Sequence, residues 1–243
     1  MFSIFKKKPV KVTDLCWLGL DMHSHLLPGI DDGAPDVAQT VALITKLNAL
    51  GLSKFFCTPH IFKELYPNTS DSIRQALEAA KDALKAAKIN VEIEAAAEYM
   101  IDENFESEDE HICLPKKYIL IEMSYLNESP NVEQIIFDLQ IKGYIVILAH
   151  PERYTFYHKN YQRLHRLKDM GCLFQLNLLS VIGYYGPQVK QAADYLLRLK
   201  LYDLAGTDLH HERHMSALEK SVKKGELYDL IGNYNFRNVE IFG

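Results

Sequence analysis

The sequence has few cysteines and no long apolar run, and each absence excludes a class of protein. Its 4 cysteines include no C-x-x-C pair, which argues against a disulfide framework. The longest apolar stretch, residues 144–149, is far shorter than the roughly 20 residues that a membrane-spanning helix requires. We therefore expect a protein of the reducing cytoplasm that has no membrane span.

Positive charge is also scarce. The formal net charge is -5 and the main basic run is Lys6-Lys7-Lys8, so no nucleic-acid-binding surface is expected. The mostly apolar residues 1–5 precede these lysines, which is the reverse of the order in a secretory signal. This segment would either fray as a tail or touch an anionic membrane surface. An acidic protein that binds an anion must concentrate positive charge locally, and metal ions would do so.

Seven short apolar runs alternate with longer amphipathic segments. Because the runs are mostly continuous in Val, Ile, Leu, Phe and Tyr, they predict strands that are covered on both faces. Strands that alternate with helices are typical of βα units around a parallel sheet. The predicted strands span residues 16–20, 54–57, 91–97, 118–121, 144–149, 172–176 and 202–206.

The segments between these strands carry apolar residues at helical spacing. The first predicted helix begins near Pro35 and ends before Gly51, and Ser70 or Asp71 is the candidate N-cap of the second. The later helices are expected at about residues 132–142, 160–170, 187–199 and 217–230, the last with a less regular pattern around Gly225.

The fold class that follows is α/β, as an irregular (β/α)7 TIM-like barrel. No repeat, low-complexity segment or linker divides the chain, so we predict one domain over residues 1–243, with a short N-terminal extension at residues 1–15. In barrels of this kind the chemistry lies in the loops that follow the strands, because these loops converge at one end.

Six of the seven predicted strands are followed by histidine, aspartate or glutamate. The first leads into Asp21-Met22-His23-Ser24-His25, and alternate residues of an extended chain face the same way. The motif Asp31-Asp32-Gly33 comes shortly after. The other strand ends supply His60, Glu98, Glu122, His150, Asp208 and His210.

Each of these signals is weak by itself. His60 and His150 taken singly are as readily core histidines with satisfied hydrogen bonds, and Glu98 and Glu122 as readily solvated carboxylates. A carboxylate that follows a buried strand is nevertheless costly to bury without a cation. Together, half of the 10 histidines and four carboxylates at one rim exceed what packing needs.

The composition of this set predicts the chemistry. Nitrogen and oxygen ligands without thiolate favour Mn, Fe or Zn in a catalytic site that holds water, and argue against a structural zinc. Nine ligands suit two or three ions that share a bridging carboxylate. Such ions would polarise phosphate oxygens and lower the pKa of a bound water toward about 7. The set therefore predicts phosphoester hydrolysis.

Four motifs carry a resemblance to a known family. They are residues 21–33 (DMHSHLLPGIDDG), Thr58-Pro59-His60, residues 148–154 (LAHPERY) and Asp208-Leu209-His210. In order and spacing they resemble the PHP (polymerase and histidinol phosphatase) superfamily, and within it the bacterial manganese-dependent protein-tyrosine phosphatases of the CpsB/CapC type. The resemblance runs from about residue 20 to the C-terminus. It implies a PHP fold with a metal cluster at the C-terminal ends of the strands, and Mn as the first choice of metal, with Fe, Zn or Mg as alternatives.

The resemblance also implies a scheme of metal ligands. A first ion would take His23, His25, Glu98 and Asp208, a second would take Glu98, Glu122 and His150, and a third would take Asp32, His60 and His210. Asp31 would lie in a turn or support a ligand, although the sequence allows Asp31 and Asp32 to exchange roles.

The resemblance assigns phosphate binding to two arginines, with Asp208 as their catalytic neighbour. These are Arg153 and, after the last strand, Arg213, whose segment of residues 211–215 is shorter than is usual in the family. An arginine fork matches phosphate oxygens. The alternative for Arg153 is an ion pair with Glu152 or stacking on Tyr154, and the alternative for Arg213 is a surface ion pair.

The implied reaction is attack of a metal-activated hydroxide on the phosphorus of phosphotyrosine, without a phosphoenzyme. Cysteine-based phosphatases need an arginine six residues after the cysteine, and the residues at that spacing here are Met22, Lys63, Ile119 and Leu178. Protonation of the leaving group is open among His210, His211, His214 and a metal-bound water. Aromatic side chains in residues 61–67 and 178–187 would flank the phosphotyrosine ring or cover the barrel core.

The substrate that the resemblance implies is a phosphotyrosyl protein, a membrane-anchored bacterial tyrosine kinase that regulates capsule or exopolysaccharide synthesis. Two other hypotheses remain. One is a different PHP-type phosphoesterase such as a histidinol-phosphate phosphatase, which usually has histidine where this chain has Asp32 and Glu122. The other is a non-catalytic, metal-bound scaffold, against which the complete ligand set counts. The oligomeric state is left open.

Overall fold

The computed structural model describes residues 11–103, 105, 110–158 and 160–243. The predictions for residues 1–10, among them the run Lys6-Lys7-Lys8, lie outside the described residues. The rest of the extension packs onto the fold: Leu15 is fully buried, and Lys11 Nζ donates a hydrogen bond to the carbonyl of Lys224.

In the described part of the chain, the strands form two sheets, and every pairing is parallel. One sheet pairs β1 (Lys54–Cys57) with β3 (Glu92–Ala95). The other has six strands in the order β2-β4-β5-β6-β7-β8. These six strands are β2 (His60–Ile61), β4 (Glu98–Met100), β5 (Tyr118–Glu122), β6 (Ile145–Ala149), β7 (Leu173–Asn177) and β8 (Leu204–Gly206).

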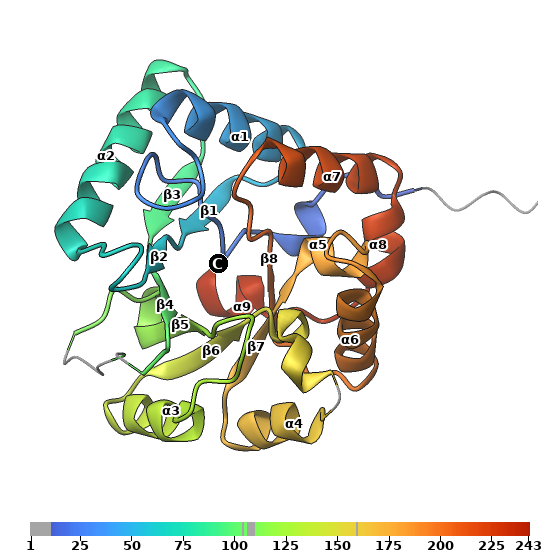
Figure 1. Cartoon of the computed structure of the whole chain (residues 1–243). Coiled ribbons are helices and arrows are strands. Elements are labelled where there is room, and N and C mark those ends of the chain that lie inside the picture. Colours follow the sequence, from blue (N-terminus) through green and yellow to red (C-terminus); the bar gives the residue numbers. More distant parts are fainter. Residues whose placement is uncertain (1–10, 104, 106–109, 159) are drawn as a thin grey trace, which may run out of the picture.

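Helices surround these strands, as Figure 1 shows. The predicted α/β class is therefore confirmed. The helices are α1 (Val37–Ala49), α2 (Ser70–Ala86), α3 (Val132–Ile141), α4 (Gln162–Asp169), α5 (Leu178–Val181), α6 (Pro187–Arg198), α7 (Glu212–Lys223), α8 (Glu226–Ile231) and α9 (Asn238–Phe242). No helix of the described residues is both long and apolar enough to cross a membrane.

The first predicted strand is wrong. Residues Cys16–Leu18 form a 3₁₀ turn, η1, that ends at Gly19 with φ +79°. Leu15 and Leu18 lie three residues apart and are both buried, so the apolar run covers one side of a tight turn. A short apolar run does not by itself distinguish a strand from a helical turn.

The residues after η1 take the place of that strand. Asp21 makes a parallel bridge with Phe55 of β1, and Ser24 makes one with Leu209, just after β8. Backbone hydrogen bonds from Phe56 to Asp21 and from Asp208 to His23 continue this contact on both sides. Residues 21–25 thus lie between β1 and β8, which brings His23 and His25 beside the end of β8.

The predicted strand at residues 91–97 is divided in the structure. Residues Glu92–Ala95 pair with β1, while Glu98–Met100 form a separate strand in the other sheet. There Glu98 pairs with His60 of the short strand β2, which the sequence does not predict. This division places Glu98 inside a parallel pair instead of in a loop.

Most helices begin and end near their predicted bounds, with three differences. The N-cap of α2 is Thr69, not Ser70 or Asp71: its side chain accepts from the amide of Ser72, whose hydroxyl accepts from the amide of Thr69. The last predicted helix is two helices, because Gly225 has φ +72° between α7 and α8. Residues Leu178–Val181, predicted as loop, form α5.

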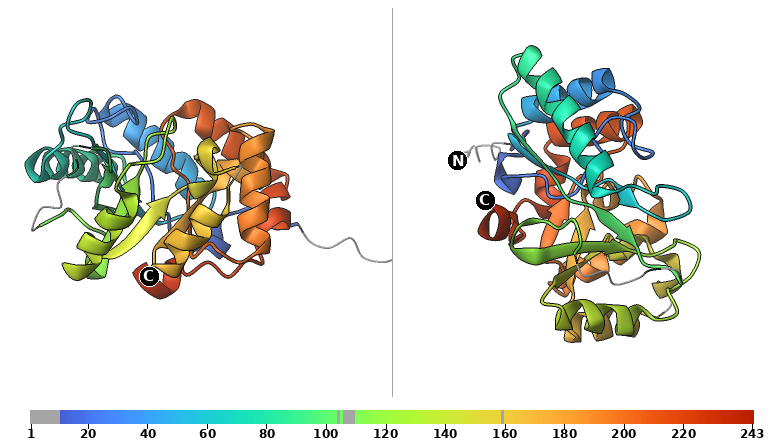
Figure 2. Two further views of the ribbon diagram at one scale, coloured as in Figure 1. Left: turned by 60° about the horizontal axis from the view of Figure 1, so that its bottom comes forward. Right: turned by 90° about the vertical axis from the view of Figure 1, so that its left-hand side faces the viewer.

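The smaller of two buried apolar clusters closes the end of the strands that is opposite the site. Leu20, Met22 and side chains of β1, β5 and β6 belong to it, together with Ile241 and Phe242 of α9. The Phe56 and Phe242 rings lie 5.6 Å apart. In the right-hand view of Figure 2, α9 lies on the side of the molecule away from the loop that follows β2. The carboxyl ends of the strands are therefore left for polar side chains.

Candidate metal centre

Four buried side chains form a compact group at the carboxyl ends of the strands: His23, His25, Glu98 and Asp208. The Nε2 atoms of the two histidines lie 3.3 Å apart. Each of these nitrogens lies 3.3–3.4 Å from Glu98 Oε2 and from Asp208 Oδ1. Points at the corners of a regular tetrahedron with such edges lie about 2.0 Å from its centre, which is the bond length of nitrogen and oxygen ligands to a divalent metal. The donor set therefore fits a metal ion.

The unused hydrogen-bonding capacity of the carboxylates supports this assignment. Glu98 Oε2 and Asp208 Oδ1 are buried, and neither atom has a hydrogen-bond partner among the described residues. An acceptor of this kind is costly to bury unless something compensates it. Both atoms belong to the tetrahedral group, so a cation at its centre would satisfy them together.

The second nitrogen of each histidine in the group is held by another side chain. His23 Nδ1 lies 2.9 Å from Gln175 Oε1, and His25 Nδ1 lies 2.8 Å from Asp31 Oδ2. Metal-binding histidines usually donate their other N–H in this way, which fixes the tautomer and the ring orientation. Asp31 therefore supports His25, as the sequence suggested, and Asp32 is free to face the site.

A second group surrounds His60. Its Nδ1 lies 2.8 Å from Glu122 Oε1 and 3.2 Å from Glu98 Oε2. The scheme implied by the resemblance combines Glu98 and Glu122 with His150, and that assignment stays a prediction. His150 Nε2 lies 3.1 Å from Glu98 Oε1, the other oxygen of the same carboxylate. Glu98 thus contacts both histidines, His60 through Oε2 and His150 through Oε1.

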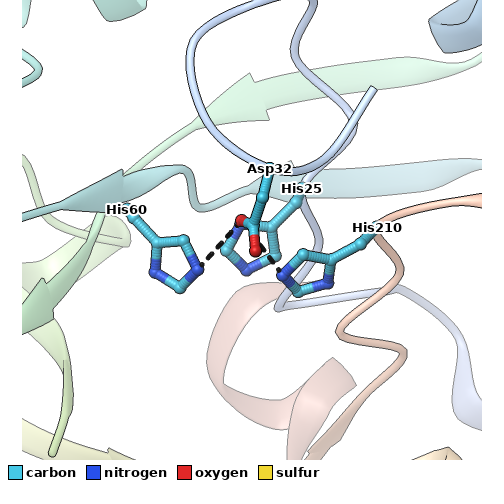
Figure 3. A group of neighbouring side chains, drawn as sticks. All are labelled: His25, Asp32, His60 and His210. Atoms are coloured by element: carbon cyan, nitrogen blue, oxygen red, sulfur yellow. Dashed lines mark ion pairs between the residues drawn. The ribbon is translucent and has the colours of Figure 1, made fainter. Parts of the chain in front are cut away.

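The third group lies nearer the surface and is drawn in Figure 3, where the rings of His25, His60 and His210 surround Asp32. Asp32 Oδ1 lies 3.4 Å from His60 Nε2 and 3.6 Å from His210 Nε2. The sequence-based scheme assigned Asp32, His60 and His210 to one ion, and the structure brings these three together and adds His25. Half of Asp32 is exposed, so this group borders the cavity described below.

The electrostatics of the group favour a bound cation. Burial alone would raise the pKa of Glu98 and that of Asp208, but the neighbouring histidines, His23 first among them, hold both pKa values well below their usual range. Both carboxylates are therefore ionised at neutral pH. With Asp32 and Glu122 nearby, four acidic side chains converge on one small volume.

Two residues beside Glu98, His150 and Asp208, have strained backbone. His150, directly after β6, has φ +34°, and Asp208, shortly after β8, has φ +48°. Neither residue is glycine, so each left-handed conformation costs on the order of 1 kcal/mol or more. In both cases the chain turns sharply at the end of a strand and directs the side chain toward Glu98. Strain of this kind is common at functional sites.

Arg153 lies beside the metal group and is held on three sides. Its Nη1 donates to Asp208 Oδ2 at 2.7 Å, while Asp208 Oδ1 faces the histidines. The guanidinium lies over the rings of Tyr125 and Tyr185, with its Cζ 4.5 Å and 4.2 Å from their centroids. The predicted alternatives, pairing with Glu152 or stacking on Tyr154, are not what the structure shows. Arg153 is positioned to meet an anion that approaches the metal group.

A cavity of about 330 Å³ opens over this site. Arg153, Asp32, His60, Glu122 and His210 line it. Its aromatic walls are Phe62, Tyr66 and Tyr125, and the Tyr66 ring stacks on His60 at 5.5 Å. His211, directly before α7, and His214, in the first turn of α7, also line the cavity.

Arg213 has a different position. It is exposed in the first turn of α7, and it is not among the residues that line the cavity. The described structure therefore gives no geometric support to phosphate binding by Arg213, and that role stays a prediction from the resemblance.

Three contributors to the site were missed by sequence reasoning. Gln175 and Asn177 lie on β7, which was the one predicted strand without an assigned ligand; Gln175 holds His23, and Asn177 Nδ2 donates to Asp208 Oδ2 at 2.7 Å. Tyr125 follows β5 and stacks on Arg153. Polar residues inside the apolar run of β7 were the available signal, because a buried amide requires a partner.

Comparisons with known proteins agree with this geometry. Residues 19–225 match the family model described as capsular polysaccharide synthesis, CpsB/CapC. The tyrosine-protein phosphatase YwqE of Bacillus subtilis is 30% identical over 196 residues, covering 79% of this chain and 77% of that protein. The tyrosine-protein phosphatase CpsB of Streptococcus pneumoniae is 25% identical over 201 residues, covering 79% and 83% respectively.

Solved structures give the same result. A chain from the crystal structures of YwqE from Bacillus subtilis and CpsB from Streptococcus pneumoniae, described as unique metal-dependent tyrosine phosphatases, superposes with a TM-score of 0.76. The two chains are 28% identical, and the match covers 87% of this chain and 90% of that one. The Zn-containing histidinol phosphate phosphatase of Lactococcus lactis, at 15% identity and a TM-score of 0.50, shares the fold alone. The metal-binding geometry and these matches lead to one conclusion: the chain belongs to the CpsB/CapC family.

Proposed function

We propose that this protein is a metal-dependent protein-tyrosine phosphatase. The observation that carries the proposal is the compact group of His23, His25, Glu98 and Asp208, with Arg153, which lines the adjoining cavity, bound to the outer oxygen of Asp208. The two relatives named as tyrosine-protein phosphatases support the choice of activity.

We propose two or three divalent ions, with Mn as the first choice and Fe, Zn or Mg as alternatives. His23, His25, Glu98 and Asp208 would hold one; Glu122, His60 and His150 lie around Glu98 for a second; and Asp32 and His210 complete a third. When bound, the ions would supply Lewis-acid activation of water and of the phosphate oxygens. The donor set, without thiolate, suits this catalytic role.

The protein's own side chains would orient the substrate. Arg153 would bind phosphate oxygens with its planar fork and neutralise charge that develops during transfer. Tyr66 and Tyr125 form part of the cavity wall and would flank the phenyl ring of phosphotyrosine. Departure of the tyrosyl oxygen needs little acid assistance. Since His210 is assigned to an ion, His211, His214 and a metal-bound water are the remaining proton sources, and burial lowers the pKa of His214 to about 4.

The cysteines do not provide an alternative nucleophile. None of the four is among the residues that line the cavity. Burial raises the pKa of Cys57, which directly follows two buried phenylalanines on β1, to about 12. A thiol in that state is a poor nucleophile at neutral pH.

The test compares the manganese-loaded full chain with Glu98→Gln, which keeps the shape of the bridging carboxylate and removes its charge. Glu92→Gln, on the exposed face of β3, is the matched control. We expect hydrolysis of a phosphotyrosyl peptide by the wild type and the control, and loss of both bound metal and activity in Glu98→Gln. Faster turnover of histidinol phosphate than of the peptide would favour the other phosphoesterase. Metal binding without hydrolysis of either substrate would favour a scaffold.

Further parts of the proposal concern the setting of the enzyme. The substrate would be a membrane-anchored tyrosine kinase of capsule or exopolysaccharide synthesis; the family description, capsular polysaccharide synthesis, supports the capsule setting. The protein would act in the cytoplasm, where its free cysteines stay reduced. The two sheets would together form one irregular seven-stranded, TIM-like barrel in a single domain, since residues 21–25 connect β1 to β8.

A further inference from the structure

A second cavity of about 380 Å³ adjoins the cavity over the metal group. The two share Phe62 and Met100 as walls. We propose that this second cavity binds a large apolar side chain of the substrate polypeptide, from a residue that flanks the phosphotyrosine. The inference rests on the proposed phosphatase function and adds recognition of the polypeptide to it.

The same two strands serve both cavities. On β2, His60 faces the metal group and the next residue, Ile61, lines the second cavity. On β4, Glu98 faces the metal group and Tyr99 lines the second cavity. Across the two strands, His60 pairs with Glu98 and Ile61 pairs with Tyr99. Along each strand, successive side chains point to opposite faces. The second cavity therefore lies behind the parallel pair that presents the metal ligands.

The lining of the second cavity indicates the chemistry of its occupant. Ile61, Phe62, Met100, Phe105 and Ile112 provide apolar and aromatic surface, which is typical of pockets that bind an apolar group. Among the described residues, the charged side chains at this cavity are Lys63, Asp102 and Glu110, and the polar residues Asn68, Thr69, Ser70 and His111 complete its wall. Two carboxylates and one lysine give the cavity a negative balance of charge, which disfavours binding of a second phosphate group. An apolar side chain is thus the better match.

The position of the cavity indicates where that side chain comes from. Residues of an extended peptide advance about 3.3 Å each, and neighbours point to opposite sides. A polypeptide whose phosphotyrosine occupies the first cavity would cross Phe62 and Met100, and a side chain one or two positions away would reach the second. At the mouth, Leu65 lines the first cavity and is 66% exposed, although it is apolar. A bound polypeptide would cover it.

The experiment uses the manganese-loaded full chain and a series of phosphotyrosyl peptides. The parent peptide has alanine at the two positions on each side of the phosphotyrosine, and each position is changed singly to phenylalanine. We expect phenylalanine at one of these positions to raise kcat/KM about tenfold, mainly through KM, as burial of a large apolar side chain implies. p-Nitrophenyl phosphate, which has no flanking residue, measures the chemistry alone.

Variants of the cavity separate this role from a structural one. Phe105→Ala and Ile112→Ala should each remove most of the preference for phenylalanine and leave turnover of p-nitrophenyl phosphate unchanged. Phe137→Ala, at an exposed phenylalanine of α3, is the matched control and should keep the preference. Binding of a non-hydrolysable phosphonate peptide, followed by fluorescence anisotropy, should show the same order of affinities without turnover.

The outcomes are distinct. If phosphotyrosyl peptides are hydrolysed with no dependence on the flanking residues, or if the variants lower p-nitrophenyl phosphate turnover as much as peptide turnover, the second cavity is not a substrate subsite. In that case the proposed phosphatase function stands. If neither the peptides nor p-nitrophenyl phosphate is hydrolysed, the proposed function fails and this inference fails with it.

Discussion

Arg153 and Asp208 form an ion pair of 2.7 Å in which the two oxygens of the carboxylate have different partners. Oδ2 accepts from Arg153 Nη1 and from the side-chain Nδ2 of Asn177, whereas Oδ1 is directed at the Nε2 atoms of His23 and His25. One side chain therefore couples the proposed metal site to the proposed phosphate site. Four predictions follow from this arrangement and from the groups that support it.

Replacement of Arg153 should impair transfer more than metal binding. Arg153→Ala removes the cationic fork beside the metal group and is expected to lower kcat/KM for a phosphotyrosyl peptide by about 100-fold or more. Arg153→Lys, which keeps the charge and loses the planar fork, should recover only part of this loss. Metal content measured on the same samples should stay near the wild-type value. Wild-type kinetics in Arg153→Ala would show that the arginine has no part in phosphate binding.

The two tyrosines that enclose Arg153 should matter through their rings. Tyr185→Ala removes one stacking partner and is expected to weaken inhibition by inorganic phosphate about tenfold, since a desolvated cation–π contact is worth about 1–2 kcal/mol. Tyr185→Phe keeps the ring and loses only the hydroxyl near Asn177 Nδ2, so it should behave nearly as the wild type. Tyr184→Ala, at the partly exposed neighbour, is the control. Equal effects of the Phe and Ala variants would contradict an ordering role for the ring.

Asp31 should control metal affinity without being a ligand. Its Oδ2 holds His25 Nδ1, and its Oδ1 accepts from the amide of Gly33. Asp31→Ala would free the His25 ring and is expected to weaken manganese binding by about 10- to 100-fold, as loss of a supporting hydrogen bond does in other metal sites. Asp36→Ala, at the exposed N-cap of α1, removes a nearby carboxylate that has no contact with His25. Titration calorimetry with Mn²⁺ would compare them, and unchanged affinity in Asp31→Ala would refute the role.

Glu152 should make the stability of the protein depend on pH. Its Oε1 accepts from Ser180 Oγ and the amide of Asn177, and its Oε2 accepts from Tyr202 Oη. Burial raises the pKa of Glu152, and these hydrogen bonds only partly oppose the shift. The pKa of Glu152 is higher in the folded protein than in the unfolded chain. The contribution of Glu152 to the free energy of unfolding is therefore complete below the unfolded pKa and is lost as the pH rises through the folded pKa.

Glu152→Gln isolates that contribution, because the amide does not titrate. The difference in free energy of unfolding, wild type minus variant, should fall as the pH rises above about 4, the pKa of an unperturbed glutamate, when measured by urea denaturation. Glu128→Gln, at a less buried carboxylate that pairs with Arg163, is the comparison. A difference that stays constant, or that grows with pH, would mean that the pKa of Glu152 is not raised in the folded protein.

Much of the candidate site could be predicted from the sequence. All nine predicted ligands lie in the three groups or contact Glu98 directly, because histidines and acids that directly follow apolar runs are fixed in place by parallel strands. Most helices were also predictable, since their apolar spacing is a local property of the chain. The first strand was wrong, because a five-residue apolar run does not distinguish a strand from the turn at Cys16–Leu18.

The sequence by itself thus determined the types of ligand, the parallel α/β class and the end of the strands at which chemistry is expected. Only the tertiary structure decided which atoms meet: His60 beside Glu122, the two partners of Asp208, and the enclosure of Arg153 by Tyr125 and Tyr185. Tyr125 and Tyr185 are 60 residues apart in the chain. Their meeting depends on the order of strands in the sheet and on the left-handed turns at His150 and Asp208, and no local pattern of residue types encodes either.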